Sequence, residues 1–103
     1  MSDEKLEWGP DEGKMTWHEA VAFAKAKGDG WRLPTVPELV AQFDYDKGKP
    51  KSEDWKRAWY WSSSAYADYA TYAWGVDFDY GYAGYGDGVG NAGRVRCVRE
   101  AKP

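Results

Sequence analysis

The organisation of the chain is clearest in one stretch, Gly30-Trp31-Arg32-Leu33-Pro34-Thr35-Val36-Pro37-Glu38-Leu39. Thr35 followed three residues later by Glu38 has the spacing of a capping box, and proline is tolerated in the first turn of a helix. Because Pro34 disfavours the helical conformation of the residue before it, residues 31–33 are expected to form a short extended link. We expect a helix that starts at Thr35 and runs to about Asp44, with an apolar stripe made of Val36, Leu39, Val40 and Phe43.

The same helix-starting device occurs upstream of this stretch. Thr16 and Glu19 have capping-box spacing and Gly28 is a typical stop, which predicts a helix over about residues 16–27. Downstream, residues 45–57 form a charged, turn-rich loop, and the stretches 59–62, 74–78 and 94–99 are typical of strands. Two helices packed on a small antiparallel sheet predict an α+β fold. Within the strand at 74–78, the side chains expected to face inward are Trp74, Val76 and Phe78.

Length and composition narrow the class of protein. The 103 residues suffice for one domain, and a net charge of −3 disfavours a nucleic-acid partner, which would require a basic surface. The single cysteine, Cys97, excludes an internal disulfide framework. No apolar run reaches about 18 residues and the first residues are acidic and polar, so we expect no membrane span and no secretory signal. The default expectation is a cytoplasmic monomer, unless a partner displays the chain.

Aromatic residues make up 17% of the chain, whereas isoleucine is absent, so a core of Trp, Val, Phe and Ala is expected. The segment 62–93 is unusual because it holds no Lys, Arg, Glu, Gln, Leu, Ile or Met, and Tyr, Gly, Ala, Asp, Ser and Asn dominate it. Three interpretations compete: a low-complexity tract without structure, a structural β-region with turn glycines, and a binding surface of the kind that antibody loops build from Tyr, Gly, Ser and Asn. We favour the last. The six dominant residue types are all reached from an asparagine codon by changing adenines alone.

Four motifs in order carry a family resemblance: residues 30–39, Tyr60-Trp61-Ser62-Ser63-Ser64, residues 73–78 and residues 95–99. Over about residues 14–99 the chain resembles the small C-type-lectin-like domains of the collagen-like-protein C-terminal family. Members of that family serve as variable proteins of diversity-generating retroelements, in which a reverse transcriptase introduces adenine-specific errors into the gene. The resemblance implies a single C-type-lectin-like domain, residues 1–103, with long Gly/Tyr-rich loops, a constant scaffold (about 1–61 and 94–103) and a variable region (about 62–93).

The resemblance also implies which side chains hold the fold and which bind. The scaffold would comprise Trp31, Arg32, Leu33, Pro34, Trp61, Trp74, Val76, Phe78, Val95 and Cys97. The candidate ligand contacts are Tyr66, Asp68, Tyr69, Tyr72, Asp77, Asp79, Tyr80, Tyr82, Tyr85, Asp87 and Asn91. Glycine is also one of the six dominant residue types, so five glycines are further candidate variable positions: Gly75, Gly84, Gly86, Gly88 and Gly90. Because the surface is acidic and rich in tyrosine, a basic or amphipathic protein is the first expected partner and a glycan the second.

The sequence gives little support for a catalytic site or a metal-binding site. Asp77 and Asp79 share a strand face and could chelate a cation together, but Ca²⁺ requires six to eight oxygens, and pairing with Arg94 or Arg96 is the structural alternative. Cys97 alternates with charged residues on the last strand and is expected to be a buried thiol. We therefore expect a ligand-binding domain without catalysis, cofactor or metal. The alternatives are an enzyme of the formylglycine-generating type, which depends on active-site cysteines, and a structural accessory or lectin domain of a cell or virion surface.

Overall fold

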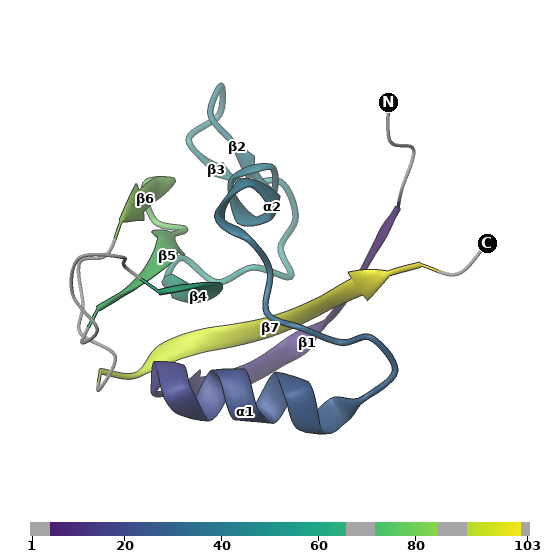
Figure 1. Ribbon diagram of the computed structural model, residues 1–103. Helices are drawn as coiled ribbons and strands as arrows, with labels where there is room; N and C mark the ends of the chain where they lie inside the picture. Colours follow the sequence, from purple (N-terminus) through teal and green to yellow (C-terminus); the bar gives the residue numbers. More distant parts are fainter. Residues whose placement is uncertain (1–4, 66–71, 85–90, 102–103) are drawn as a thin grey trace.

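A mixed five-stranded sheet forms the centre of the molecule, with a helix on each of its faces (Figure 1). The computed structural model describes residues 5–65, 72–84 and 91–101. The elements are, in chain order, β1 (Leu6–Met15), α1 (Trp17–Lys27), α2 (Val36–Val40), β2 (Phe43–Asp44), β3 (Lys49–Pro50), β4 (Trp59–Ala65), β5 (Ala73–Asp77), β6 (Tyr82–Gly84) and β7 (Gly93–Glu100). The α+β class predicted from the sequence is confirmed.

The order of strands in the sheet is β1-β7-β4-β5-β6, and β2 and β3 form a separate hairpin. Strands β4, β5 and β6 pair as an antiparallel meander, and β1 pairs antiparallel with β7. The expectation of an antiparallel sheet is wrong at one place, because β4 and β7 run parallel, with Tyr60 opposite Arg94. These two strands are far apart in the sequence, and their relative direction depends on the connection between them, which strand periodicity does not encode.

The first helix agrees with its prediction. The hydroxyl of Thr16 accepts a hydrogen bond from the Glu19 backbone N–H, the Glu19 carboxylate accepts one from the Thr16 N–H, and Gly28 ends the helix at φ +66°. Ala20 and Ala24 are buried against the sheet, which lets the helix axis approach it closely. The indole N–H of Trp17 donates to the Ser62 carbonyl at 2.8 Å and ties α1 to β4.

The second helix begins as predicted and is shorter than predicted. Thr35 and Glu38 form the capping box, but α2 ends at Val40 and not near Asp44. From Phe43 the chain forms the β2–β3 hairpin, whose turn is held by the Asp44 carboxylate, an acceptor for the N–H groups of the next turn residues, and by Gly48 at φ +67°. This local turn chemistry prevails over the helical spacing, and Phe43 is still buried beside Leu39.

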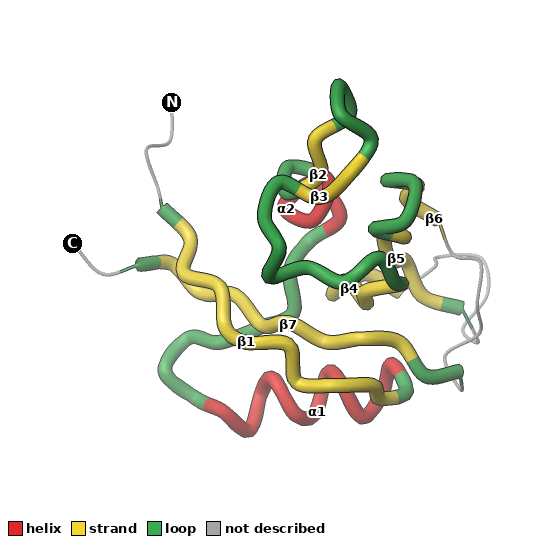
Figure 2. The backbone as a smooth tube through the Cα atoms, turned by 180° about the vertical axis from the view of Figure 1, so that it is seen from behind, coloured by secondary structure: helices red, strands yellow, loops and turns green. Residues whose placement is uncertain are grey.

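The edge strand β1 has no counterpart in the sequence prediction. It pairs with β7 from Leu6 to Met15, with register shifts on both sides of Asp11. Gly9, Pro10 and Gly13 normally mark turns, and the two bulges accommodate them within a strand. Figure 2 shows β1 and β7 as two long adjacent strands.

Two hydrophobic clusters occupy the two faces of the sheet. The cluster under α1 contains Leu33, Trp61, Val95 and Cys97, and the cluster under α2 and the hairpin contains Leu39, Trp55, Tyr60, Val76 and Phe78. The buried aromatic and valine side chains confirm the expected core composition, although Trp74 is only half-buried. The scaffold residues Leu33, Pro34, Trp61, Val76, Phe78, Val95 and Cys97 are all buried.

One charged side chain belongs to the second cluster. Arg96 is 7% exposed, its Nε donates to the Gly9 carbonyl at 2.7 Å, and its guanidinium lies 4.4 Å from the Trp55 ring centroid and 5.7 Å from that of Trp8. The delocalised guanidinium cation is weakly hydrated and is attracted to the aromatic faces. Arg96 therefore joins β1 and β7 to the aromatic core, and it is not the partner of Asp77 or Asp79.

Candidate functional site

The predicted ligand contacts divide between described and undescribed parts of the chain. Tyr66, Asp68, Tyr69, Tyr85 and Asp87 lie outside the described residues. Of the remaining six, Asn91 precedes β7, and the other five fall on β5, β6 and their flanks: Tyr72, Asp77, Asp79, Tyr80 and Tyr82.

The turn between β5 and β6 presents two of the predicted tyrosines. Tyr80 is 66% exposed and Tyr82 is 70% exposed, and their ring centroids are 6.1 Å apart. Gly81 between them adopts φ +80°, and a Cβ there would lie 2.7 Å from Phe43 and Tyr45 atoms. The tight approach of the hairpin to Gly81 therefore fixes the turn while the neighbouring rings remain in solvent.

A third exposed tyrosine lies beside this turn, and sequence reasoning missed it. Tyr45 is 55% exposed, and its hydroxyl donates to the Gly81 carbonyl. It belongs to the β2–β3 hairpin, within a stretch expected to be a charged loop. Tyr45 lies beside this turn because the β2–β3 hairpin packs against Gly81, between Tyr80 and Tyr82. No local pattern in the sequence indicates this contact between the hairpin and the turn.

A cross-strand row connects the predicted site to β4. Trp59 is opposite Asp77 and Asp77 is opposite Tyr82, so the three side chains lie on one face of β4, β5 and β6. The Asp77 carboxylate accepts the Asp79 backbone N–H at 2.9 Å, which closes the turn. Trp59 was not among the predicted contacts. Its position two residues before Trp61 was the available signal, since it places both indoles on the same sheet face.

The alternative that the sequence left open, a pairing of Asp77 or Asp79 with Arg94 or Arg96 on the last strand, is wrong. Arg94 binds Asp11 at 3.1 Å, and Arg57 lies 3.7 Å from an oxygen of Asp79. The reason is the side-chain alternation of β7: Arg94 lies on the face of Tyr60, which also contacts Asp11, and not on the face of Asp77. Asp77 and Asp79 thus differ in their surroundings, because in the described part of the chain only Asp79 has a cationic side chain nearby.

Trp59 is held against the sheet by two glycines. A Cβ at Gly75 would lie 2.5 Å from Trp59 Cζ2 and 2.6 Å from the Tyr60 carbonyl, and a Cβ at Gly93 would lie 2.7 Å from Trp59 Cδ1. Gly75 therefore cannot vary freely, in contrast to the expectation for it. The indole Nε1 of Trp59 is buried and has no hydrogen-bond partner among the described residues.

The remaining two described candidates lie elsewhere. Tyr72 is half-buried and precedes β5, at the end opposite the β5–β6 turn. Asn91 is exposed and precedes β7. The structure thus brings Asp77, Asp79, Tyr80 and Tyr82 together, and Tyr72 lies at the other end of β5. Asn91 lies two residues before Gly93, whose backbone packs against Trp59.

The exposed described residues of the segment 62–93 share a restricted set of residue types, although residues of these types are also buried in it, such as Ser62 and Ala73. In its described part the exposed residues are Ser63, Ser64, Ala65, Tyr80, Tyr82, Ala83, Asn91 and Ala92, all of the six dominant types. Only three described residues of the segment belong to other types: Trp74 is half-buried, and Val76 and Phe78 are fully buried.

The chain has one cysteine and one histidine, and they lie in different surroundings. Cys97 is fully buried, and this burial raises the pKa of its thiol, which disfavours the reactive thiolate. His18 is exposed on the first turn of α1. Over residues 5–65, 72–84 and 91–101, no three metal-ligating side chains gather in one place, and no helix has the length and apolarity needed to cross a membrane.

Comparison with known proteins gives one match. No curated protein and no solved structure matches the chain. The family model of the Lcl C-terminal domain matches residues 2–99, which includes the unpredicted strand β1 as well as the four motifs. The chain therefore belongs to the Lcl C-terminal domain family.

Proposed function

We propose that this chain is a ligand-binding domain with a C-type-lectin-like fold whose segment 62–93 is diversified by a retroelement through adenine-directed mutagenesis. The segment displays a Tyr/Asp/Gly-rich surface, and residues 1–61 and 94–103 form the constant scaffold that carries it. The ligand is a protein, and the domain binds it without catalysis. Family membership over residues 2–99 supports this proposal at the level of the domain.

The observation that carries the proposal is the composition of the exposed part of the segment. Every exposed described residue of the segment is one of the six dominant types, all of which adenine changes in an asparagine codon can produce. Among the described residues of other types, Val76 and Phe78 are buried and Trp74 is half-buried. A surface under diversification requires this pattern, since side chains in solvent can vary at little cost in stability whereas buried ones cannot.

The sequence of the DNA around the gene tests the proposal. We expect a near-copy of the 3′ coding segment that differs from it only where the copy carries adenine, next to a reverse-transcriptase gene. The differing codons should include those of Tyr80 and Tyr82 and exclude those of Trp74 and Trp61. A gene with no such repeat in its surroundings would overturn retroelement diversification and leave a fixed binding surface.

A further inference from the structure

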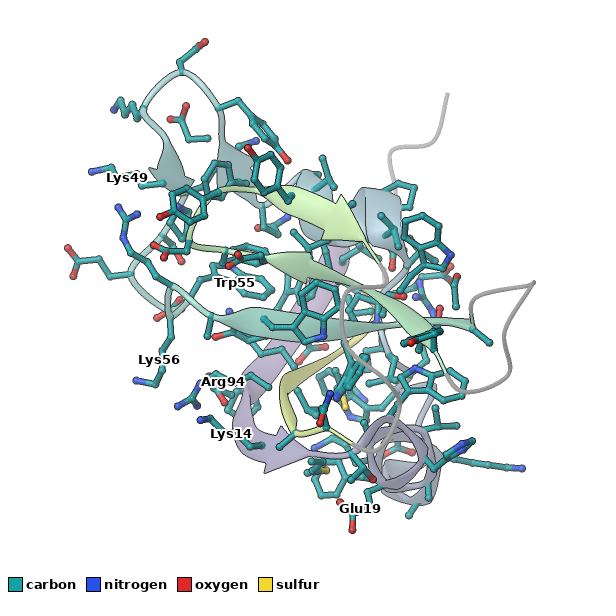
Figure 3. The ribbon with its side chains drawn as sticks, turned by 90° about the vertical axis from the view of Figure 1, so that its left-hand side faces the viewer. Lys14, Glu19, Lys49, Trp55, Lys56 and Arg94 are labelled. Atoms are coloured by element: carbon teal, nitrogen blue, oxygen red, sulfur yellow. The ribbon has the colours of Figure 1, made fainter. Side chains whose placement is uncertain are left out.

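The open sheet face beside the β5–β6 turn combines one carboxylate with two aromatic rings. Trp59, Asp77 and Tyr82 are consecutive cross-strand neighbours on β4, β5 and β6. Helix α1 packs on β1, β4 and β7, and α2 packs on the opposite face, against β4 and β5. Figure 3 looks onto β4, β5 and β6, with α1 below them. Within the described part of the chain, the row is thus partly exposed: Trp59 and Asp77 are half-buried and Tyr82 is 70% exposed.

The carboxylate of this row has no cation of its own. Among the described residues, no lysine or arginine lies within ion-pair distance of Asp77, and the segment 62–93 contains neither residue type. The basic residues nearest to Asp77 in the sequence are engaged elsewhere: Arg94 pairs with Asp11, and Arg96 donates to the Gly9 carbonyl. Arg57 contacts Asp79, and the Lys56 side chain points away from the sheet in Figure 3. Asp77 uses one oxygen for the Asp79 N–H. An ionised carboxylate has further acceptor sites free for a ligand.

The aromatic neighbours favour one kind of cation. One side of the Trp59 indole is packed on Gly75, so its opposite side is turned away from the sheet, and Tyr82 is 70% exposed. A guanidinium is planar, stacks on aromatic rings and matches a carboxylate with two parallel hydrogen bonds, whereas an ammonium is a compact and strongly hydrated charge. Carboxylate and rings together select arginine over lysine.

We propose that Trp59, Asp77 and Tyr82 bind an arginine side chain of a protein partner. The arginine stem lies along the Trp59 indole, its guanidinium pairs with Asp77, and Tyr82 covers it from the β6 side. This inference rests on the proposed binding function and specifies the chemistry of the protein that is bound.

The test is an NMR titration of the full ¹⁵N-labelled chain with Nα-acetyl-arginine methylamide. We expect saturable shifts of the Trp59 indole N–H and of the β5 and β6 amides, with a dissociation constant on the order of millimolar. Nα-acetyl-citrulline methylamide, which has the same shape without the charge, should leave these signals unmoved. Equal shifts with the lysine derivative would overturn the selection of arginine, and no shift with the arginine derivative would overturn the site.

Two variants locate the interaction. Asp77→Asn keeps an oxygen for the Asp79 N–H and should weaken arginine binding about tenfold, because it removes the charged acceptor. Asp46→Asn makes the same charge change on the exposed turn of the β2–β3 hairpin and should leave binding unchanged. Equal weakening by both variants would show general charge attraction and overturn the site.

A missing DNA repeat would overturn retroelement diversification without altering these NMR signals. The failure of the proposed function and the failure of the arginine site are therefore distinguishable.

Discussion

Gly75 is the residue at which the binding surface and the scaffold meet. Its backbone supports the Trp59 indole, and a methyl group there would collide with Trp59 at 2.5 Å and with the Tyr60 carbonyl at 2.6 Å. We predict that Gly75→Ala lowers the free energy of unfolding by about 1–3 kcal/mol, because the indole must move from its packed position. Urea unfolding measures this difference.

Gly9 provides the matched control for this substitution. A Cβ at Gly9 would lie 3.4 Å or more from its neighbours, which is ordinary contact. Gly9→Ala should therefore change the free energy of unfolding by no more than about 0.5 kcal/mol. If Gly75→Ala were as stable as the unmodified chain, position 75 would be free to vary with the rest of the segment.

Tyr80 and Tyr82 should contribute little to stability. Both rings are mostly in solvent, so we predict that the double substitution Tyr80→Ser and Tyr82→Ser changes the free energy of unfolding by about 0.5 kcal/mol or less. Tyr60→Ala truncates a fully buried ring and should lower the free energy of unfolding by about 3–5 kcal/mol. Thermal denaturation of both variants measures these differences. A large loss in the double variant would mean that these tyrosines hold the fold and are not a displayed surface.

For single residues, the sequence predicts which side chains are buried better than it predicts which side chains form the candidate site. The alternation of apolar residues predicts that Val76 and Phe78 are core residues, and the tendency of a free cysteine to be buried predicts the same for Cys97. All three side chains are buried. Tyrosine itself does not encode its exposure: Tyr60 is fully buried and Tyr82 is 70% exposed. Their difference comes from strand pairing, which sets the sheet face of each residue. Residue type alone therefore gave no indication that Trp59 and Tyr45 border the site.

The entry to α2 is stabilised by a charged side-chain pair. Arg32 Nη1 and Nη2 contact the two oxygens of Glu38 at 2.8 and 2.9 Å, and Glu38 also accepts the Thr35 N–H. The hydrogen bond from Arg32 lowers the pKa of the Glu38 carboxyl. The link that leads from α1 to α2 is thus fixed to the first turn of the helix.

We predict that Glu38→Gln lowers the free energy of unfolding by about 2 kcal/mol at neutral pH. Because the pKa of Glu38 is lower in the folded state, its contribution is present above the unfolded value of 4.5 and is lost as the pH falls below it. The difference between the two chains should therefore shrink on acidification, which urea unfolding between neutral pH and acid would measure. A difference that stayed constant with pH would contradict this account.

The hydroxyl group of Tyr60 joins β4 directly to β1 and, through Asp11, to β7. It donates to Asp11 Oδ2 at 2.9 Å and accepts the Lys56 N–H at 3.0 Å, while Asp11 also binds Arg94. Burial is the largest cause that raises the pKa of Tyr60 to about 12, from a usual value of 10. The neutral phenol is therefore favoured in the folded chain over a wider pH range than in the unfolded chain.

This raised pKa predicts a loss of stability in alkali. The contribution of the neutral Tyr60 is complete below pH 10, and it is lost between pH 10 and about 12 because the unfolded chain deprotonates first. We expect this contribution to be about 2–3 kcal/mol. Unfolding at successive pH values should show a shallower alkaline decline for Tyr60→Phe than for the unmodified chain. Parallel declines would assign the loss to other groups.

At the level of elements, prediction succeeded where one local signal decided the structure. The capping boxes at Thr16 and Thr35 define both helix starts. It failed where distant partners decide: Phe43 has helical spacing with Leu39 but pairs with Pro50. Residues 6–15 contain glycines and a proline, and they form a strand only because β7 provides a partner along their length.

The two hydrophobic clusters depend on the same sheet, so the molecule should unfold as one unit. Neighbouring residues of β4 face opposite clusters: Trp61 lies under α1 and Tyr60 lies under α2. Strand β1 contributes to both sides, because the Met15 carbonyl accepts the Trp61 indole N–H and Trp8 packs edge-on to Trp55. Loss of β1 would therefore disturb both clusters at once, which makes it the most informative element to remove.

We predict that a chain beginning at Thr16 does not fold cooperatively. It would lack the antiparallel partner of β7, the acceptor for Trp61 and the carboxylate of Asp11 that binds Tyr60 and Arg94. Far-UV circular dichroism during heating should show no sigmoidal transition, and a synthetic peptide of residues 5–15 should restore one in proportion to its concentration. A truncated chain that melted as sharply as the complete one would mean that the four motifs suffice for the fold. Restoration by the peptide would instead show that β1, which the motifs do not include, is the element that joins the two clusters.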